Sequence, residues 1–271
     1  MTRPILFLSD FGLDDEYVGL CHAVIARVAP EVRVIDLHHG IPPQDVVTGA
    51  LTLAQAVAYG PKDAVFLAVV DPGVGTGRRG VAFQAGDALL VGPDNGVLMP
   101  AAAALGGVST GVELEVGRVV PWSVSGTFHG RDVFAPAAAR LAAGADLGEV
   151  GEGIDPSELT ELGLWSRLEV EEERVSTTVI GVDRFGNVRL GARPEDLKAA
   201  GLEADELVLL ARGAPMTVRR VRAYGELEPA TVGLLVDSAG WLAVVRNGAS
   251  AADQLGLSPG DAVELQASGV G

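Results

Sequence analysis

The sequence predicts an α/β unit with a central, mostly parallel sheet, followed by a smaller β-barrel-like unit. Two observations carry this prediction. From residue 5 to about residue 145, short apolar runs alternate with longer alanine-rich stretches of helical periodicity. Continuous apolar strands between helices are typical of a parallel sheet that is covered on both faces. After residue 173, short β-like runs separated by Gly, Asp and Asn turns favour a small barrel.

The elements of the first unit follow one another at regular spacing. The apolar runs expected as strands are ILFLSD (5–10), VRVIDL (32–37), AVFLAVV (64–70), and the hairpin pair GVAFQAG (80–86) and DALLVGPD (87–94). The helical patterns are residues 16–30, residues 46–60, NGVLMPAAAALGG and RDVFAPAAARLAAG. Strands that alternate with helices in this way indicate a layered α/β architecture.

The chain changes character once, which sets the expected division. We predict an α/β domain over residues 1–157, a linker over 158–172, and a barrel domain over 173–271; the acidic run EVEEER (169–174) covers the end of this linker. Within the barrel segment, only EDLKAAG and ASAADQLGL have a helical pattern.

Composition excludes several classes of function. The 271 residues include 36 Asp and Glu against 20 Lys and Arg, a formal net charge of −16 that disfavours nucleic acid and anionic membrane surfaces as partners. Cys21 is the single cysteine, so the chain predicts neither an internal disulfide nor a cysteine-based metal site. The apolar run near the N-terminus is too short for a signal segment or a membrane span. We therefore expect a cytoplasmic protein.

Acidic residues follow the first expected strand, in SDFGLDDEY. Asp10 stands at the strand end, where open α/β sheets bind ligands, and is an expected ligand contact. For Asp14 and Asp15 three interpretations remain open: oxygen ligands for a divalent cation, acceptors for ribose hydroxyls, or capping of the helix that follows.

The third expected strand ends in VDPGVGTGRRG. Residues 75–80 match GxGxxG formally, but the pattern follows the wrong strand and precedes a β-like run, so we reject a dinucleotide site. What remains is Asp71 and, seven residues on, Arg78, joined by a glycine loop. A carboxylate beside a guanidinium stays ionised and oriented, which suits the positioning of a water molecule. A purely structural ion pair is the alternative.

Four further segments carry polar candidates. In SGTFHGRDVFAP, His129 precedes a helix as a base, a water-positioning group or a helix-entry hydrogen bonder, and Gly130 allows close backbone approach. VGPDNGVL has ordinary turn chemistry. Asp183 and Asn187 suit either a ligand or a hairpin turn. Ser238 and Arg246 carry the same ambiguity.

Together, the motifs carry a family resemblance. SDFGLDDEYVG, DLHHGIPPQDV, VDPGVGTGRRG, VGPDNGVL, GTFHGRDVFAP and VDRFGNV occur in this order. The chain closely resembles the S-adenosylmethionine hydroxide adenosyltransferases, the adenosine-forming S-adenosylmethionine hydrolases related to fluorinase and chlorinase. It differs at Gln44, where the family usually has an aromatic residue, and at Ala239, where the halogenases have Arg.

The resemblance implies an activity and a site. The activity is hydrolysis of S-adenosyl-L-methionine at the 5′ carbon to adenosine and L-methionine, without metal or organic cofactor. The implied catalytic triad is Asp71, Arg78 and His129. The implied substrate contacts are Asp10, Asp15, Gly130, Asp183, Asn187, Ser238 and Arg246. The resemblance also implies a homotrimer with ligand at the subunit interface.

Two alternatives stay open. A calcium-dependent nucleoside hydrolase would use Asp10, Asp14 and Asp15 as metal ligands. A non-catalytic adenosine-binding trimer would bind ligand without turnover.

Overall fold

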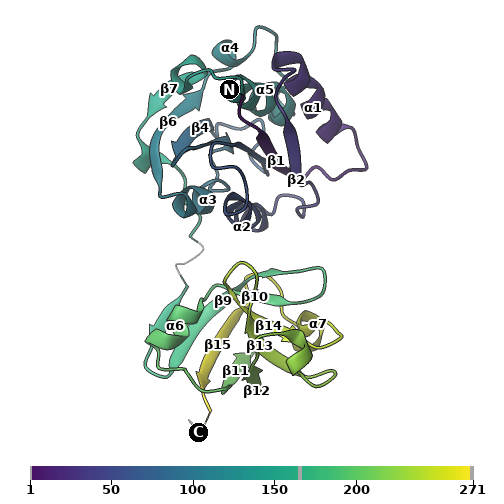
Figure 1. Ribbon diagram of the computed structural model, residues 1–271, viewed down its shortest axis with the longest axis vertical. Helices are drawn as coiled ribbons and strands as arrows, with labels where there is room; N and C mark the ends of the chain where they lie inside the picture. The colour runs from purple at the N-terminus through teal and green to yellow at the C-terminus, as the bar shows by residue number, and fades with distance from the viewer. Residues whose placement is uncertain (1, 164–166, 269–271) are drawn as a thin grey trace. The chain divides into compact units, whose positions relative to one another are not determined.

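The computed structural model describes residues 2–163 and 167–268, and its ribbon is drawn in Figure 1. The chain forms two compact units, Met1–Leu162 and Gly163–Gly271. The buried apolar side chains of the first unit form two clusters and those of the second unit form clusters of their own. Each unit therefore has a core of its own.

A seven-stranded sheet forms the centre of the first unit. Its strands are β1 (Ile5–Ser9), β2 (Val34–His38), β3 (Val65–Val69), β4 (Gly80–Ala85), β5 (Ala88–Pro93), β6 (Val108–Leu114) and β7 (Gly151–Ile154). They lie in the order β2-β1-β3-β5-β4-β6-β7. The pairings β2–β1, β1–β3 and β3–β5 are parallel, and the pairings β5–β4, β4–β6 and β6–β7 are antiparallel. Only β4 and β7 therefore run opposite to the other strands. The mostly parallel sheet is confirmed.

Helices cover both faces of this sheet, as Figure 1 shows. They are α1 (Tyr17–Val28), α2 (Val46–Val57), α3 (Met99–Ala104), α4 (Val116–Val119) and α5 (Ala135–Ala142), with shorter turns η1 (Gly130–Phe134), η2 (Leu147–Glu149) and η3 (Pro156–Glu158). Because side chains alternate along a strand, Ile5 and Phe7 pack with α1 and α5, whereas Leu6 and Leu8 pack with α2 and α3. All four are almost fully buried, which explains the continuous apolar run.

Strands β6 and β7 are not predicted from the sequence. The segment VSTGVEL of β6 has polar and glycine positions, and GEGI of β7 has only one apolar residue. Their backbone groups are satisfied by neighbours: β6 pairs with β4, and β7 pairs with β6 at the sheet edge. Tertiary pairing thus forms strands that local composition does not indicate.

The second unit is a closed barrel. Its strands are β8 (Glu169–Glu171), β9 (Arg174–Val182), β10 (Val188–Leu190), β11 (Glu206–Ala211), β12 (Ala214–Arg220), β13 (Val232–Val236), β14 (Leu242–Arg246) and β15 (Ala262–Ala267), with α6 (Pro194–Ala199), η4 (Tyr224–Glu226) and α7 (Ala251–Leu255). The order is β10-β14-β13-β12-β11-β15-β9, and the β9–β10 pairing closes the ring of seven. The predicted barrel is confirmed.

Part of the expected linker forms a strand. β8 lies inside residues 158–172 and pairs antiparallel with β9, and all three of its residues are exposed. Charged side chains are common on edge strands because they discourage further pairing, so an acidic run fits an edge strand as well as a linker.

Among the described residues, no helix is long and apolar enough to cross a membrane.

Two glycines of β7 provide a matched test of this packing. A Cβ atom at Gly151 would lie 1.9 Å from the carbonyl oxygen of Glu113, whereas one at Gly153 would meet no atom within 4 Å. We expect Gly151→Ala to lower the free energy of unfolding by roughly 1–3 kcal/mol, because the β6 backbone has to shift. Gly153→Ala should change it by less than about 0.5 kcal/mol. Urea denaturation checks both, and equal effects would contradict the packing described for β7.

Candidate active site

Strand ends bring the candidate residues of the first unit together. Asp10 directly follows β1, and Asp71 stands two residues beyond the end of β3. These strands are parallel neighbours, so their carboxyl ends lie at the same edge of the sheet. The backbone N–H of Asp10 also donates to the Val69 carbonyl, at 3.4 Å, which ties the two strand ends directly.

Arg78 joins Asp71 to His129. Its Nε donates to Asp71 Oδ1 at 2.8 Å, and Nη2 donates to Oδ2 of the same carboxylate. Nη2 also lies 2.8 Å from Nδ1 of His129. The side chains of Asp71 and Arg78 are only 7% and 12% exposed. The structure thus brings the three predicted residues into one connected cluster.

The glycine loop folds back as the spacing suggests. Thr76 donates its hydroxyl to the Gly73 carbonyl at 2.6 Å, which closes the turn before Arg78. Gly75 has a φ of +77°, and a Cβ there would lie 2.6 Å from the Gly126 carbonyl oxygen. A residue with a side chain would therefore be strained and would also clash, so glycine is needed at this point.

The hydrogen bonds determine the protonation of His129. A guanidinium has donors only, so Nδ1 of His129 accepts from Arg78, and its proton is on Nε2. Partial burial, together with the charge of Arg78, lowers the pKa of His129 below 6.5. The imidazole is therefore neutral near pH 7 and presents one N–H donor at Nε2.

Asp10 is held in a different environment. Its Oδ2 accepts from the backbone N–H of Gln44 at 2.8 Å, and Gln44 has the unusual φ of +67°. Partial burial raises the pKa of Asp10 despite this hydrogen bond, and the nearby charge of Asp71 adds to the increase. The two carboxylates therefore lie close enough to influence each other.

His39, one of the two histidines that follow the second expected strand, is buried next to the segment that holds Asp10. His39 Nδ1 lies 2.8 Å from Ser9 Oγ, and the His39 carbonyl accepts from Gly12 N–H at 2.7 Å. On its other side, Nε2 lies 3.0 Å from Asp36 Oδ1. His39 thus anchors the residues on both sides of Asp10. The signal was present as the DLHH segment after the second strand, but the pattern did not show which histidine faces inward.

Within the residues that the structure describes, Asp14 and Asp15 take no part in the hydrogen bonds of Asp71, Arg78 and His129. Both are exposed in the bend before α1, whose N-cap is Glu16 and has no side-chain capping bond. The capping interpretation is therefore wrong for these two residues. Across residues 2–163 and 167–268, no group of three or more His, Cys, Asp or Glu side chains is placed to hold a metal ion. The calcium-dependent alternative gains no support.

Aromatic side chains lie beside His129, and sequence reasoning missed these. The Phe11, Tyr17 and Phe128 rings pack edge to face or tilted, with centroids 5.1–5.9 Å apart. Gly130 is required here, because a Cβ atom would lie 2.7 Å from the Phe11 ring. Phe128 lies 111 residues beyond Tyr17 in the chain, so only the fold brings it against Phe11 and Tyr17.

The candidates of the barrel unit form a second group. Asp183 Oδ1 accepts from the N–H groups of Phe185 and Asn187 at 2.8 and 2.9 Å, and Oδ2 accepts from the Asn187 side chain at 2.7 Å. The Asn187 amide nitrogen is also 3.2 Å from the hydroxyl of Tyr224, a residue that the sequence did not single out. The hydrogen bonds of Asp183 and Asn187 therefore stabilise the turn, and the same two side chains form a polar group at the surface of the barrel.

Ser238 lies in the turn before β14, and Arg246 is the last residue of that strand. Ser238 stands in a turn ordered by its neighbour Asp237, which accepts from the N–H groups of Ala239 and Trp241. Arg246 donates from Nε to the Ala230 carbonyl at 3.0 Å. No hydrogen bond in the described part of the chain joins Arg246 to the Asp183 turn.

Ligands of open α/β sheets bind beyond the carboxyl ends of the strands, so the carboxylate, guanidinium and imidazole joined at this edge mark the candidate active site of an α/β protein. In this protein the α/β unit is followed by a barrel, a combination that restricts the family of proteins to which the chain can belong. The chain belongs to the SAM hydroxide adenosyltransferase family: the N-terminal domain of that family matches residues 5–151, and its C-terminal domain matches residues 177–264. The resemblance carried by the motifs is confirmed.

Individual relatives cover almost the whole chain. The (R)-S-adenosyl-L-methionine hydrolase of Salinispora tropica is 48% identical over 266 residues, which cover 98% of each chain. A crystal structure of an uncharacterized conserved protein from Thermotoga maritima has a TM-score of 0.89 at 34% identity, covering 97% of this chain and 99% of that one. A fluorinase of Actinoplanes sp. is 26% identical over 286 residues, covering 95% of this chain and 96% of its own.

The cluster predicts how His129 titrates. The pKa of His129 is below 6.5 in the folded chain and about 6.5 in the unfolded chain. The neutral imidazole therefore contributes to the stability of the fold above pH 6.5, and this contribution is lost as the pH falls toward the folded pKa. We expect Arg78→Met to raise the pKa of His129, because a cation leaves while Asp71 stays. NMR titration of the imidazole checks this. Arg212→Met, which removes an ion pair of the barrel, is the control. An unchanged or lower pKa in Arg78→Met would contradict the assigned contact.

Proposed function

We propose that this protein hydrolyses S-adenosyl-L-methionine at the 5′ carbon, giving adenosine and L-methionine. The observation that carries the proposal is the connected Asp71–Arg78–His129 cluster at the carboxyl edge of the sheet. Membership of the family and the activity in the name of the Salinispora tropica relative support the same substrate.

The cluster suits the attack of water on a sulfonium substrate. The sulfonium sulfur is already a good leaving group, so no acid is needed for its departure. Asp71 would orient the water and accept its proton as the oxygen–carbon bond forms and the carbon–sulfur bond breaks. Arg78 would fix the carboxylate, and the Nε2–H of His129 would donate to the water oxygen. The main contribution of the protein is placement of the water in line with the breaking bond.

Asp71 also bears on the choice of nucleophile. Fluorinases match the chain at lower identity, and their name indicates a halide in place of water. A carboxylate at the attacking position repels an anion and accepts a hydrogen bond from water. We therefore propose water as the nucleophile, with chloride and fluoride as non-substrates.

We propose that the substrate contacts of the two units serve one ligand in a homotrimer. In the first unit the proposed contacts are Asp10, Asp15 and Gly130; in the second they are Asp183, Asn187, Ser238 and Arg246. Asp10 would bind ribose hydroxyls, and Asp183 with Asn187 would bind the methionine portion. The family resemblance supports a site shared between neighbouring subunits. We propose that catalysis needs neither metal nor organic cofactor and that the protein is cytoplasmic.

Substitution of the cluster tests the mechanism. Asp71→Asn and His129→Ala should lower kcat by roughly 10²–10⁴-fold, the scale expected for removal of a positioned acid–base group. The Kd for adenosine should change far less, because neither group is proposed to bind the nucleoside. Asp261→Asn, a barrel variant outside the site, should keep the parental kcat. Parental rates in both cluster variants would reject these roles, and free adenine as the main product would reject the reaction itself.

Complementation tests the shared site. Asp71→Asn and Asp183→Ala should each be nearly inactive as pure proteins. Trimers assembled from an equal mixture should regain about a quarter of the parental activity. Random assembly places an intact Asp71 of one subunit beside an intact Asp183 of its neighbour at one site in four. A site within a single chain would give no recovery on mixing. Light scattering would show whether the assembly is the expected trimer.

A further inference from the structure

The turn after β5 contacts both ends of the loop that carries Asp71 and Arg78. Asn95 donates from Nδ2 to the Val70 carbonyl at 2.8 Å, directly before Asp71. Its neighbour Asp94 accepts from Arg79 Nε and Nη2 at 2.9 and 2.7 Å, directly after Arg78. Two adjacent side chains of one turn thus hold the two ends of an eight-residue loop.

The Asp94 carboxylate is buried, and both of its oxygens accept hydrogen bonds. The Asp94 side chain is only 5% exposed, and Oδ1, the oxygen that Arg79 leaves free, accepts from the Thr160 N–H at 2.8 Å. Hydrogen bonding to Asp94 raises the pKa of Arg79 further. A buried carboxylate that loses its partner is strongly destabilised, so this contact keeps one geometry.

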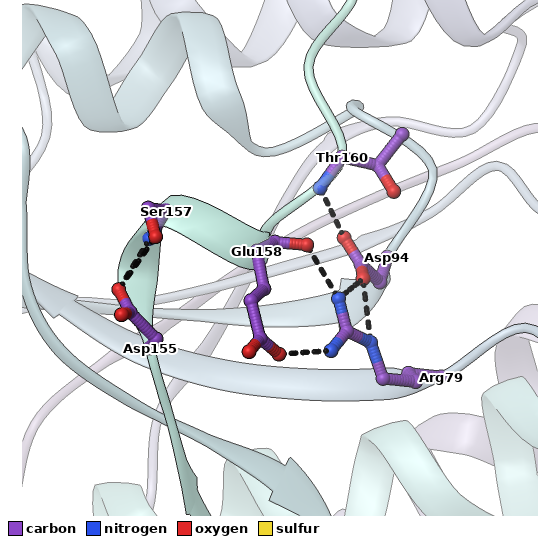
Figure 2. Close-up of polar contacts among 6 residues, drawn as sticks. All are labelled: Arg79, Asp94, Asp155, Ser157, Glu158 and Thr160. Atoms are coloured by element: carbon purple, nitrogen blue, oxygen red, sulfur yellow. Dashed lines mark hydrogen bonds and ion pairs between the residues drawn. The ribbon is translucent and has the colours of Figure 1, made fainter.

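A third segment completes the arrangement, as Figure 2 shows. Arg79 donates from Nη2 to the Glu158 carbonyl at 2.6 Å and from Nη1 to its carboxylate at 3.3 Å. Glu158 ends the turn η3, which is capped by the Asp155 side chain. The donors that Arg79 uses therefore bind Asp94 and Glu158, whereas Arg78 donates to Asp71 and His129.

We propose that Asp94 and Asn95 are positioning residues for the Asp71–Arg78–His129 cluster, acting through Arg79 and the Val70 carbonyl. The effect that we expect on kcat rests on the proposed function. In-line attack depends on the nucleophile being placed correctly, and a displacement of about 1 Å can cost about 10²-fold in rate. A loop fixed at both ends keeps Asp71 where the water is needed. The turn sequence Pro-Asp-Asn-Gly is therefore more than ordinary turn chemistry.

Two variants of nearly unchanged size test the proposal. Asn95→Leu removes the donor to Val70 without adding charge, and Asp94→Asn removes the charge that pairs with Arg79. In each, we expect kcat for S-adenosyl-L-methionine to fall roughly 10–100-fold, with KM changed less than about threefold. Asp261→Asn, which weakens the exposed Arg212 pair in the barrel, is the matched control and should keep both constants.

The NMR titration of His129 gives a second readout that needs no turnover. If the loop moves away, the pKa of His129 should rise toward its ordinary value, because both burial and the Arg78 charge decrease. In Asp94→Asn the lost negative charge alone would lower that pKa, so an upward shift reports movement of the loop.

The outcomes separate the two proposals. A lower kcat with a raised His129 pKa supports the positioning role. Folded variants that lose only thermal stability, or that lose kcat while His129 titrates as in the parent, overturn it. If the parent protein does not hydrolyse S-adenosyl-L-methionine, the proposed function fails, and the titration still decides the positioning role. Should one variant fail to fold, the other is sufficient.

Discussion

The hydrogen bonds of Arg78 to Asp71 are the interaction on which the site depends. They join the end of β3 to the start of β4, and the same guanidinium reaches His129 in a third segment. Because Arg78 only donates, it fixes both the orientation of the Asp71 carboxylate and the tautomer of His129. Burial strengthens these contacts, since water competes little at side chains that are about one-tenth exposed.

The fold supplies the support for this interaction at three places. The parallel pairing of β1 with β3 puts Asp10 beside Asp71, where their charges interact. The turn after β5 holds the flanks of the loop through Asp94 and Asn95. Behind Asp10, His39 binds Ser9 and Gly12. Each contact comes from a segment that follows a parallel strand, so one sheet edge organises the whole cluster.

The sequence predicts those parts whose signals are local. Continuous apolar runs predict β1, β3 and β5, and the spacing of Asp71 and Arg78 predicts their ion pair. Strands β6 to β8 escape prediction because pairing with a neighbour, not composition, forms them. The Phe11, Tyr17 and Phe128 cluster escapes for the same reason, since its members meet only in the folded chain. The capping interpretation of Asp14 and Asp15, one of three left open, fails because α1 begins at Tyr17 with Glu16 as its N-cap.

The central claim is that water, placed by Asp71, attacks the 5′ carbon of S-adenosyl-L-methionine. Reaction in ¹⁸O-labelled water, followed by mass spectrometry of the nucleoside, tests it most directly. The account predicts that the label enters the 5′ oxygen of adenosine, with unlabelled L-methionine as the second product and no 5′-halo nucleoside when chloride or fluoride is added. Label on the 1′ oxygen of ribose with release of free adenine would contradict it.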